Sequence, residues 1–159
     1  MKAVLISIQP KWIEKIANGE KTIKVCKTRP KLETPFKCYI YCTYGNPKDN
    51  YCLGKRGEVI GEFVCDRIYE WTYNYNVGEY NIGGDSLCRT CLSYSEFENY
   101  GKGKTVYGWH ISNLVIYDKP KELSEFKHWK NYNMGSWVLS NLEEVTRPPQ
   151  SWCYVEKGE

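Results

Sequence analysis

Alternating apolar and polar residues predict five or six short strands with few helices between them. The strands are expected at residues 2–8, 20–28, 36–44, 58–68, 105–118 and 152–156. In the third strand, Cys38 and Ile40 share one face while Tyr39 and Tyr41 share the other. Residues 127–146 show no clear pattern. Several short strands with few helices indicate an α+β chain built on a small mixed β-barrel.

Two short helices and one helical turn are expected beside the strands. Pro10 occupies the favoured first position of a helix, and Gly19 suits the residue just after its end. Ser93 or Ser95 is expected to cap a second short helix. A helical turn is expected at residues 121–126. These helices would flank the barrel.

Length and composition indicate one globular domain over residues 1–159. Apolar residues make up 42% and charged residues 26%, as in globular chains. The apolar run at residues 3–8 is too short for a signal peptide or a membrane span, so no membrane association is expected. Eight cysteines without a secretion signal indicate free thiols in a reducing compartment, which predicts a cytoplasmic protein.

The charge of the chain is unevenly distributed. The net charge is +3, but residues 11–37 hold eight basic and three acidic residues. Such a patch is typical of a protein that binds a phosphate-bearing partner, although a solvated lysine-rich surface gives the same pattern. The best candidates for phosphate contacts are Lys11, Lys21, Lys24, Lys27 and Arg29.

A strand over residues 20–28 would place Lys21 and Lys27 opposite Lys24. Near a strand end, however, both sets could line the rim of one cleft. The sequence therefore allows a shared lysine site without fixing it.

The strand at residues 105–118 carries a second candidate set. Tyr107 and Trp109 share one face, and His110 and Ser112 share the other. A base can stack on an aromatic ring and form a hydrogen bond with a neighbouring polar group. Core packing of one of the two faces is the alternative.

The segment that enters the last strand combines proline with polar and aromatic residues. Arg147 can grip a phosphate, and Gln150 can read a base edge. Ser151 and Trp152 follow directly, and the intervening prolines fix the backbone that presents them. A stiff entry into the strand, without a binding role, is the alternative.

Cys88 and Cys91 have the spacing of half a zinc site. The other pair, Cys38 and Cys42, falls on an apolar face, and His128 is isolated. One pair is a weak motif, so neither a metal nor another cofactor is expected.

Four segments carry a resemblance to a known family. They are residues 7–16 (SIQPKWIEKI), 19–23 (GEKTI), 107–112 (YGWHIS) and 147–152 (RPPQSW). In this order they resemble the ASCH domain family of the PUA-like superfamily, in its small phage and bacterial type. The resemblance implies a PUA-like mixed barrel with a cleft that binds RNA or a modified nucleotide.

The resemblance also implies a possible activity, because some small ASCH proteins are amidohydrolases that act on acylated cytidine. Lys21 matches the family lysine, but Lys24 stands at the position of the nucleophilic threonine and Cys26 at that of an arginine. An ammonium does not replace a hydroxyl nucleophile in a simple way. Thr22 shares the face of Lys24, a Cys26 thiol activated by Lys24 is a further option, and Glu96 is the acid to test.

Binding without catalysis is therefore the favoured hypothesis, and amide hydrolysis is the alternative. A third hypothesis is a protein-interaction or small-molecule-sequestering module. It rests on the segment at residues 72–86, which is rich in Tyr, Asn and Gly and is predicted to be a long irregular loop. Tyr73 and Tyr75 lie in this segment.

Overall fold

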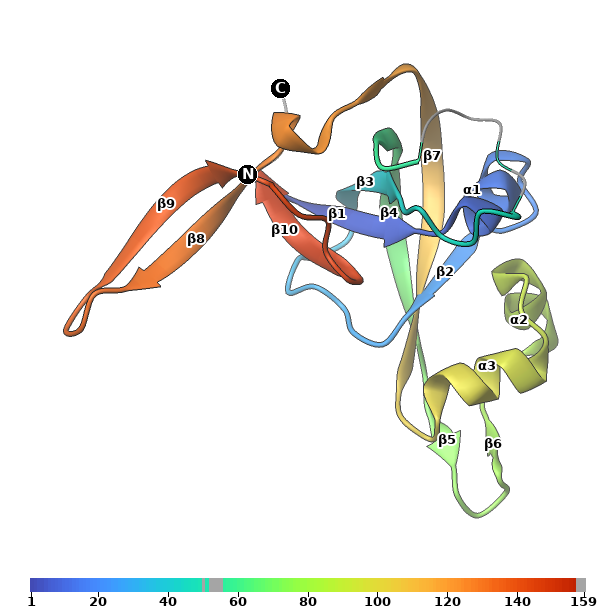
Figure 1. Cartoon of the computed structure of the whole chain (residues 1–159). Helices are drawn as coiled ribbons and strands as arrows, with labels where there is room; N and C mark the ends of the chain where they lie inside the picture. Colours follow the sequence, from blue (N-terminus) through green and yellow to red (C-terminus); the bar gives the residue numbers. More distant parts are fainter. Residues whose placement is uncertain (50, 52–55, 157–159) are drawn as a thin grey trace.

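The computed structural model describes residues 1–49, 51 and 56–156, and it confirms the α+β class (Figure 1). The main sheet has six strands in the order β10-β1-β3-β4-β7-β2, and two separate two-stranded ribbons accompany it. The elements in chain order are β1 (Lys2–Ile8), α1 (Pro10–Ala17), β2 (Ile23–Cys26), β3 (Phe36–Cys42), β4 (Val59–Trp71), β5 (Tyr73–Asn74), β6 (Glu79–Tyr80), α2 (Gly84–Thr90), α3 (Tyr94–Gly101), β7 (Val106–Lys121), the 3₁₀ turn η1 (Leu123–Glu125), β8 (Lys127–Asn133), β9 (Val138–Glu144) and β10 (Trp152–Glu156).

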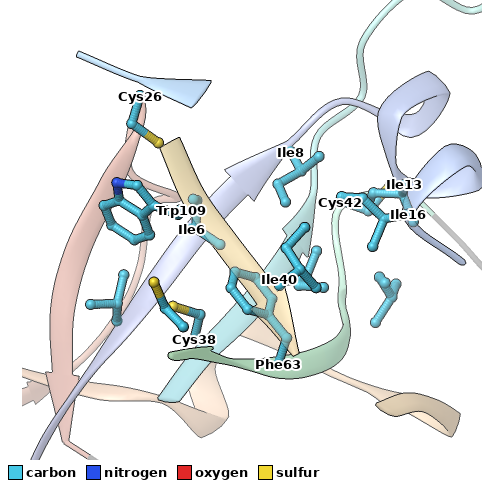
Figure 2. Packing of buried hydrophobic residues seen from close by; sticks show 14 of the residues in the cluster. Ile6, Ile8, Ile13, Ile16, Cys26, Cys38, Ile40, Cys42, Phe63 and Trp109 are labelled. Carbon is cyan, nitrogen blue, oxygen red and sulfur yellow. The ribbon is translucent and has the colours of Figure 1, made fainter. Parts of the chain in front are cut away.

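Strands β1 and β3, which are neighbours in the main sheet, bury both of their faces. Ile6 of β1 packs with Cys38 and Ile40 of β3 in one cluster, which also takes in Phe63 and Trp109 (Figure 2). On the opposite face, Leu5, Tyr39 and Tyr41 belong to a second cluster with Phe126 and Val145. The alternation predicted for β3 is therefore confirmed, and both of its faces lie in the interior because each meets apolar partners.

The thiols inside this core act as small hydrophobic groups. Cys26, Cys38, Cys42 and Cys65 are buried, and all seven cysteines that the structure describes are free. Cys52 lies outside the described residues.

Helix α1 follows the sequence prediction closely. Pro10 is its first residue, and Gly19 lies beyond its end with φ of +85°, a conformation that glycine adopts without strain. Ile13 and Ile16 face the core, and α1 connects β1 to the lysine-rich approach to β2.

The segment between β4 and β7 is more ordered than its composition suggested. Residues 72–86 contain the β5–β6 hairpin and the start of α2, which no sequence signal had indicated. Ser93, one of the two residues predicted as the cap, is the N-cap of helix α3. It forms a capping box with Glu96. A third buried cluster joins α3 to the end of β4 and the start of β7. It contains Trp71, Phe97 and Val106.

The edge strands of the main sheet do not pair with each other, so the barrel is not closed by backbone hydrogen bonds among the described residues. Side chains join the two edges instead. The indole nitrogen of Trp152 on β10 donates to the Thr28 hydroxyl, just after β2, at 2.9 Å. The Lys31 amide donates to the Tyr154 hydroxyl at 2.7 Å. This seam fixes the segment after β2 against β10.

The segment at residues 127–146, which showed no pattern, forms the β8–β9 ribbon that extends away from the sheet (Figure 1). The helical turn predicted just before it is present as η1. None of the described helices is both long and apolar enough to span a bilayer.

Candidate functional site

A cleft of about 800 Å³ opens where α1, β2, α3 and the segment before β10 meet. Among its lining residues are three of the predicted lysines, Lys21, Lys24 and Lys27. The other predicted residues on its wall are Glu96, Gln150 and Ser151. Segments more than 120 positions apart in the sequence thus contribute to one concave surface.

Lys21 lies deepest of the three lysines, with only 2% of its surface exposed. Its Nζ donates to the Thr90 carbonyl at 2.5 Å and lies 5.0 Å from the centre of the Trp12 ring. Burial, reinforced by the charge of Lys24, lowers the Lys21 pKa to about 7. Near neutral pH the chain therefore holds a partly neutral amine in the wall of the cleft.

Lys24 and Lys27 lie closer to solvent. Lys24 is half-buried on β2, where its Nζ donates to the Val25 carbonyl at 2.9 Å. The Nζ of Lys27 lies 5.0 Å from the centre of the Tyr100 ring. Because β2 ends at Cys26, Lys27 follows the strand and is not subject to its alternation. All three lysines consequently reach the same cleft.

Helix α3 supplies a wall of which the sequence analysis named only Glu96. Glu96 is the one carboxylate among the lining residues that the structure describes, and Asn99 and Tyr100 lie beside it. The Ser93 amide donates to Glu96 at 3.1 Å, and this hydrogen bond, more than any other effect, lowers the Glu96 pKa. Glu96 is therefore held as a carboxylate, which does not suit a general acid.

The segment before β10 is fixed against the end of β1. The Ser7 hydroxyl donates to the Pro149 carbonyl at 2.6 Å, and the Ser7 amide donates to the Ser151 carbonyl at 2.9 Å. These contacts hold Gln150 and Ser151 at the cleft. Arg147 is exposed and is not among the lining residues, so it does not join Lys21 and Lys24 there.

Four further predicted residues, three of them on the lysine-rich segment, are not among the residues that line the cleft. Lys11 and Arg29 are exposed, and Thr22 is half-buried with its hydroxyl unpartnered. Trp152 is half-buried in the seam with Thr28. None of these four side chains meets Lys24 in the cleft.

The predicted residues on β7 also lie away from the cleft. Trp109 is completely buried, so its ring has no surface on which a base could stack. His110 pairs with Asp66, Nδ1 to Oδ1 at 2.7 Å, and the Ser112 hydroxyl donates to the Val64 carbonyl at 2.8 Å. Trp109 therefore packs in the core, which was the alternative interpretation of its face of the strand.

The interpretation of Cys26 as an activated nucleophile is wrong. Its side chain points into the core cluster with 1% of its surface exposed. Burial raises the Cys26 pKa and outweighs the opposite effect of Lys24 and Lys21. The thiol therefore stays protonated, and it is not among the lining residues.

The zinc hypothesis finds no second half-site in the described part of the chain. Cys88 lies exposed in α2 and Cys91 follows its end, while Cys38 and Cys42 are buried in the core. No group of three or more His, Cys, Asp or Glu residues in residues 1–49, 51 and 56–156 is arranged to hold a metal ion.

A second, shallower hollow of about 630 Å³ borders the cleft and shares Glu96 and Asn99 with it. Tyr73 and Tyr75 line this hollow with ring centres 4.9 Å apart, and the Tyr75 hydroxyl donates to the Gly103 carbonyl. The aromatic excursion predicted at residues 72–86 thus lies next to the cleft rather than apart from it.

Comparison with known proteins gives a likeness of fold. No family model matches the sequence, and no curated protein matches it. The chain is similar to the crystal structure of an ASCH protein from Zymomonas mobilis, with a TM-score of 0.63 and 18% identity over 98% of this chain and 88% of that chain. Two single-substitution variants of that protein give TM-scores of 0.60 and 0.63, identities of 18% and 17%, and coverage of 99% and 98% of this chain and 92% and 89% of theirs. The chain therefore has the ASCH fold that the four sequence segments predicted.

Proposed function

We propose that this chain binds RNA or a nucleotide in the cleft between α1, β2 and α3. The observation that carries the proposal is the convergence of Lys21, Lys24 and Lys27 on a wall whose one described carboxylate is Glu96. An excess of ammonium groups in a concave, partly desolvated site favours an anionic ligand. Phosphate oxygens are suitable acceptors for Lys24 and Lys27, which are the more accessible of the three.

The rest of the lining supports a ligand that also carries a flat ring. Trp12 and Tyr100 bring aromatic surface to the cleft, and Asn99, Gln150 and Ser151 bring hydrogen-bonding groups. Bases stack on such rings and are recognised along their polar edges. The volume, about 800 Å³, lies within the range of small-ligand sites and can hold a nucleotide. The ASCH fold agrees with the family resemblance that first suggested this ligand class.

A salt titration tests the proposal. Binding of a fluorescein-labelled single-stranded RNA of about five nucleotides is measured by polarisation between about 50 and about 250 mM salt. Two phosphate contacts, from Lys24 and Lys27, give a slope of log K against log salt of about −1.4, so affinity falls about tenfold over this range. Replacing Lys24 and Lys27 together by Gln removes both contacts and should nearly abolish the salt dependence.

A matched control uses Lys127→Gln, which removes an exposed lysine on β8 away from the cleft. This variant should keep the wild-type slope and affinity. The proposal fails if neither RNA nor a mononucleotide binds at low salt, or if the control variant changes the slope as much as the double variant does. Competition by an unlabelled mononucleotide separates nucleotide binding from a requirement for RNA.

Hydrolysis of an acylated cytidine remains a second candidate because one observation favours it. The Lys21 amine, with its pKa lowered to about 7, is available near neutral pH to accept a proton from a water molecule in the cleft. Lys24 stands where the family has its nucleophilic threonine, so the water would have to attack the amide directly. Incubation of acetylcytidine with a high concentration of the protein should release cytidine in the wild type and not in Lys21→Met. No release by the wild type would eliminate this candidate.

A further inference from the structure

The β8–β9 ribbon, residues 127–144, is the most isolated part of the described chain. Its strands pair only with each other, from Lys127 opposite Glu144 to Asn133 opposite Val138. It projects away from the main sheet, and near its base the Trp129 indole donates to Glu156 of β10 at 2.8 Å (Figure 1). A two-stranded ribbon is only marginally stable in water by itself, so this one needs further contacts.

The exposed large apolar side chains of the protein gather on this ribbon. Of the twelve that the described residues contain, seven lie here, each between 37% and 60% exposed. They are Trp129, Tyr132, Met134, Trp137, Val138, Leu139 and Leu142. The cross-strand register places Trp129, Val138 and Leu142 on one face, and Tyr132 and Leu139 on the other. A ribbon that is apolar on both faces is typical of a segment covered on both sides.

The charges of the ribbon do not suit a nucleic acid. Residues 131–142 contain no charged side chain, so the outer two-thirds of the ribbon offer no cation to a phosphate. At the base, Lys130 pairs with Glu143 at 3.8 Å, and Lys127 lies opposite Glu144. These opposite charges compensate one another, so the surface of the ribbon is complementary to an uncharged, apolar partner.

The area of this surface approaches one side of a stable protein interface when both faces of the ribbon are counted. With about 200 Å² for an aromatic side chain, the exposed parts of Trp129, Tyr132 and Trp137 amount to roughly 300 Å². A standard interface buries about 800 Å² on each partner, of which about 60% is apolar, or roughly 480 Å². The four exposed aliphatic side chains add to the aromatic area, and because the seven lie on both faces, a partner that buries them contacts both faces of the ribbon.

We infer that the ribbon is a dimerisation arm and that its partner is the ribbon of a second copy of this chain. An uncharged apolar surface is complementary to another of its kind, and a two-fold axis brings identical patches together. The other exposed apolar side chains of the described residues, such as Tyr44 and Val115, are scattered over separate elements and form no comparable patch. The second ribbon supplies the contacts that a two-stranded ribbon lacks.

Sedimentation velocity of the full chain between about 1 and about 100 µM tests the inference. The wild type should be a dimer at the upper end of this range. Val138→Lys puts a charge into this apolar surface on each copy and should raise the dimer Kd about tenfold or more. Val77→Lys is the matched control, because Val77 is 65% exposed against 60% for Val138 but lies between β5 and β6. This variant should dimerise like the wild type.

Hydrogen exchange provides a second readout that does not depend on a variant. The backbone amides of residues 127–144 should exchange more slowly as the protein concentration rises, while those of the main sheet should not change. If Val138→Lys fails to fold, as judged by circular dichroism, Leu142→Gln replaces it on the same face. The inference is overturned if the wild type is monomeric at about 100 µM, or if Val138→Lys and Val77→Lys weaken the dimer equally.

Discussion

The buried amine of Lys21 should make the stability of the protein depend on pH in a way that can be calculated. In the folded chain the Lys21 pKa is lowered from 10.5 to about 7, chiefly by burial. Below pH 7 the folded and unfolded states are both protonated, and the folded state bears the full cost of the buried charge. Between about pH 7 and pH 10.5 the folded state has lost the proton that the unfolded state keeps. The free energy of unfolding therefore rises with pH across this window.

The size of the effect follows from proton linkage. Each pH unit inside the window contributes about 1.4 kcal/mol, and the contribution falls off around pH 7, where the folded state is half protonated. Integration from pH 6 to pH 9 gives about 2–3 kcal/mol for Lys21 alone. This is a large fraction of the stability of an ordinary domain.

The assay compares wild type with Lys21→Met in urea, with unfolding followed by circular dichroism at pH 6, 7, 8 and 9. Methionine keeps the length and apolar stem of lysine but leaves the Thr90 carbonyl without its donor, a roughly constant cost of about 1–3 kcal/mol. The difference in free energy of unfolding, wild type minus variant, should rise by about 2–3 kcal/mol from pH 6 to pH 9. A difference that stays flat would refute the reasoning, because it would mean that the amine is solvated.

Three further outcomes are expected. Gly108→Ala on β7 should destabilise the protein by about 1–3 kcal/mol in urea melts, since the new Cβ would overlap the Trp71 ring, while Gly84→Ala at the start of α2, whose Cβ meets no atom within 4 Å, should not destabilise it. Ser93→Ala should lower the free energy of unfolding by about 1 kcal/mol because it removes the N-cap of α3; an unchanged thermal midpoint would contradict the capping role. The thiol of Cys88, which is exposed, should react with a disulfide reagent within minutes under native conditions, and mass spectrometry of the Cys88→Ser variant should show that this early modification is lost.

The sequence predicted the elements whose signals are local. Pro10 and Gly19 delimit α1, and Ser93 caps α3, because each of these residues acts on its own turn of backbone. Helix α2 was not predicted because its N-cap is Gly83, without a side-chain hydrogen bond, and the helix has only seven residues. Short helices of this kind depend on packing rather than on local propensity.

The ribbon escaped prediction for a different reason. Its apolar residues occur on both faces, so the alternation that marks a half-buried strand is missing. If the ribbon is covered by a second copy, the sequence pattern reflects an assembly rather than a single chain.

The candidate site was predictable only in its local part. Lys21, Lys24 and Lys27 belong to one short segment, so the charge pattern found them together. The wall formed by Asn99 and Tyr100 depends on how α3 docks, about 75 positions later, and no local signal encodes that contact. The same lack of a local signal explains why His110 and Ser112 were predicted as site residues. Their alternation along the strand shows which residues share a face but not whether that face borders the cleft, and neither residue lines it.

Mapping of backbone amide shifts by NMR during titration with a short single-stranded RNA, and separately with a mononucleotide, tests the central claim most directly. Binding in the cleft predicts saturable shifts at residues 21–28, 96–100 and 150–151, and little change around His110 or in the ribbon. Shifts centred on His110 and Ser112 or on residues 127–144, or no shift at millimolar ligand and low salt, would contradict the account.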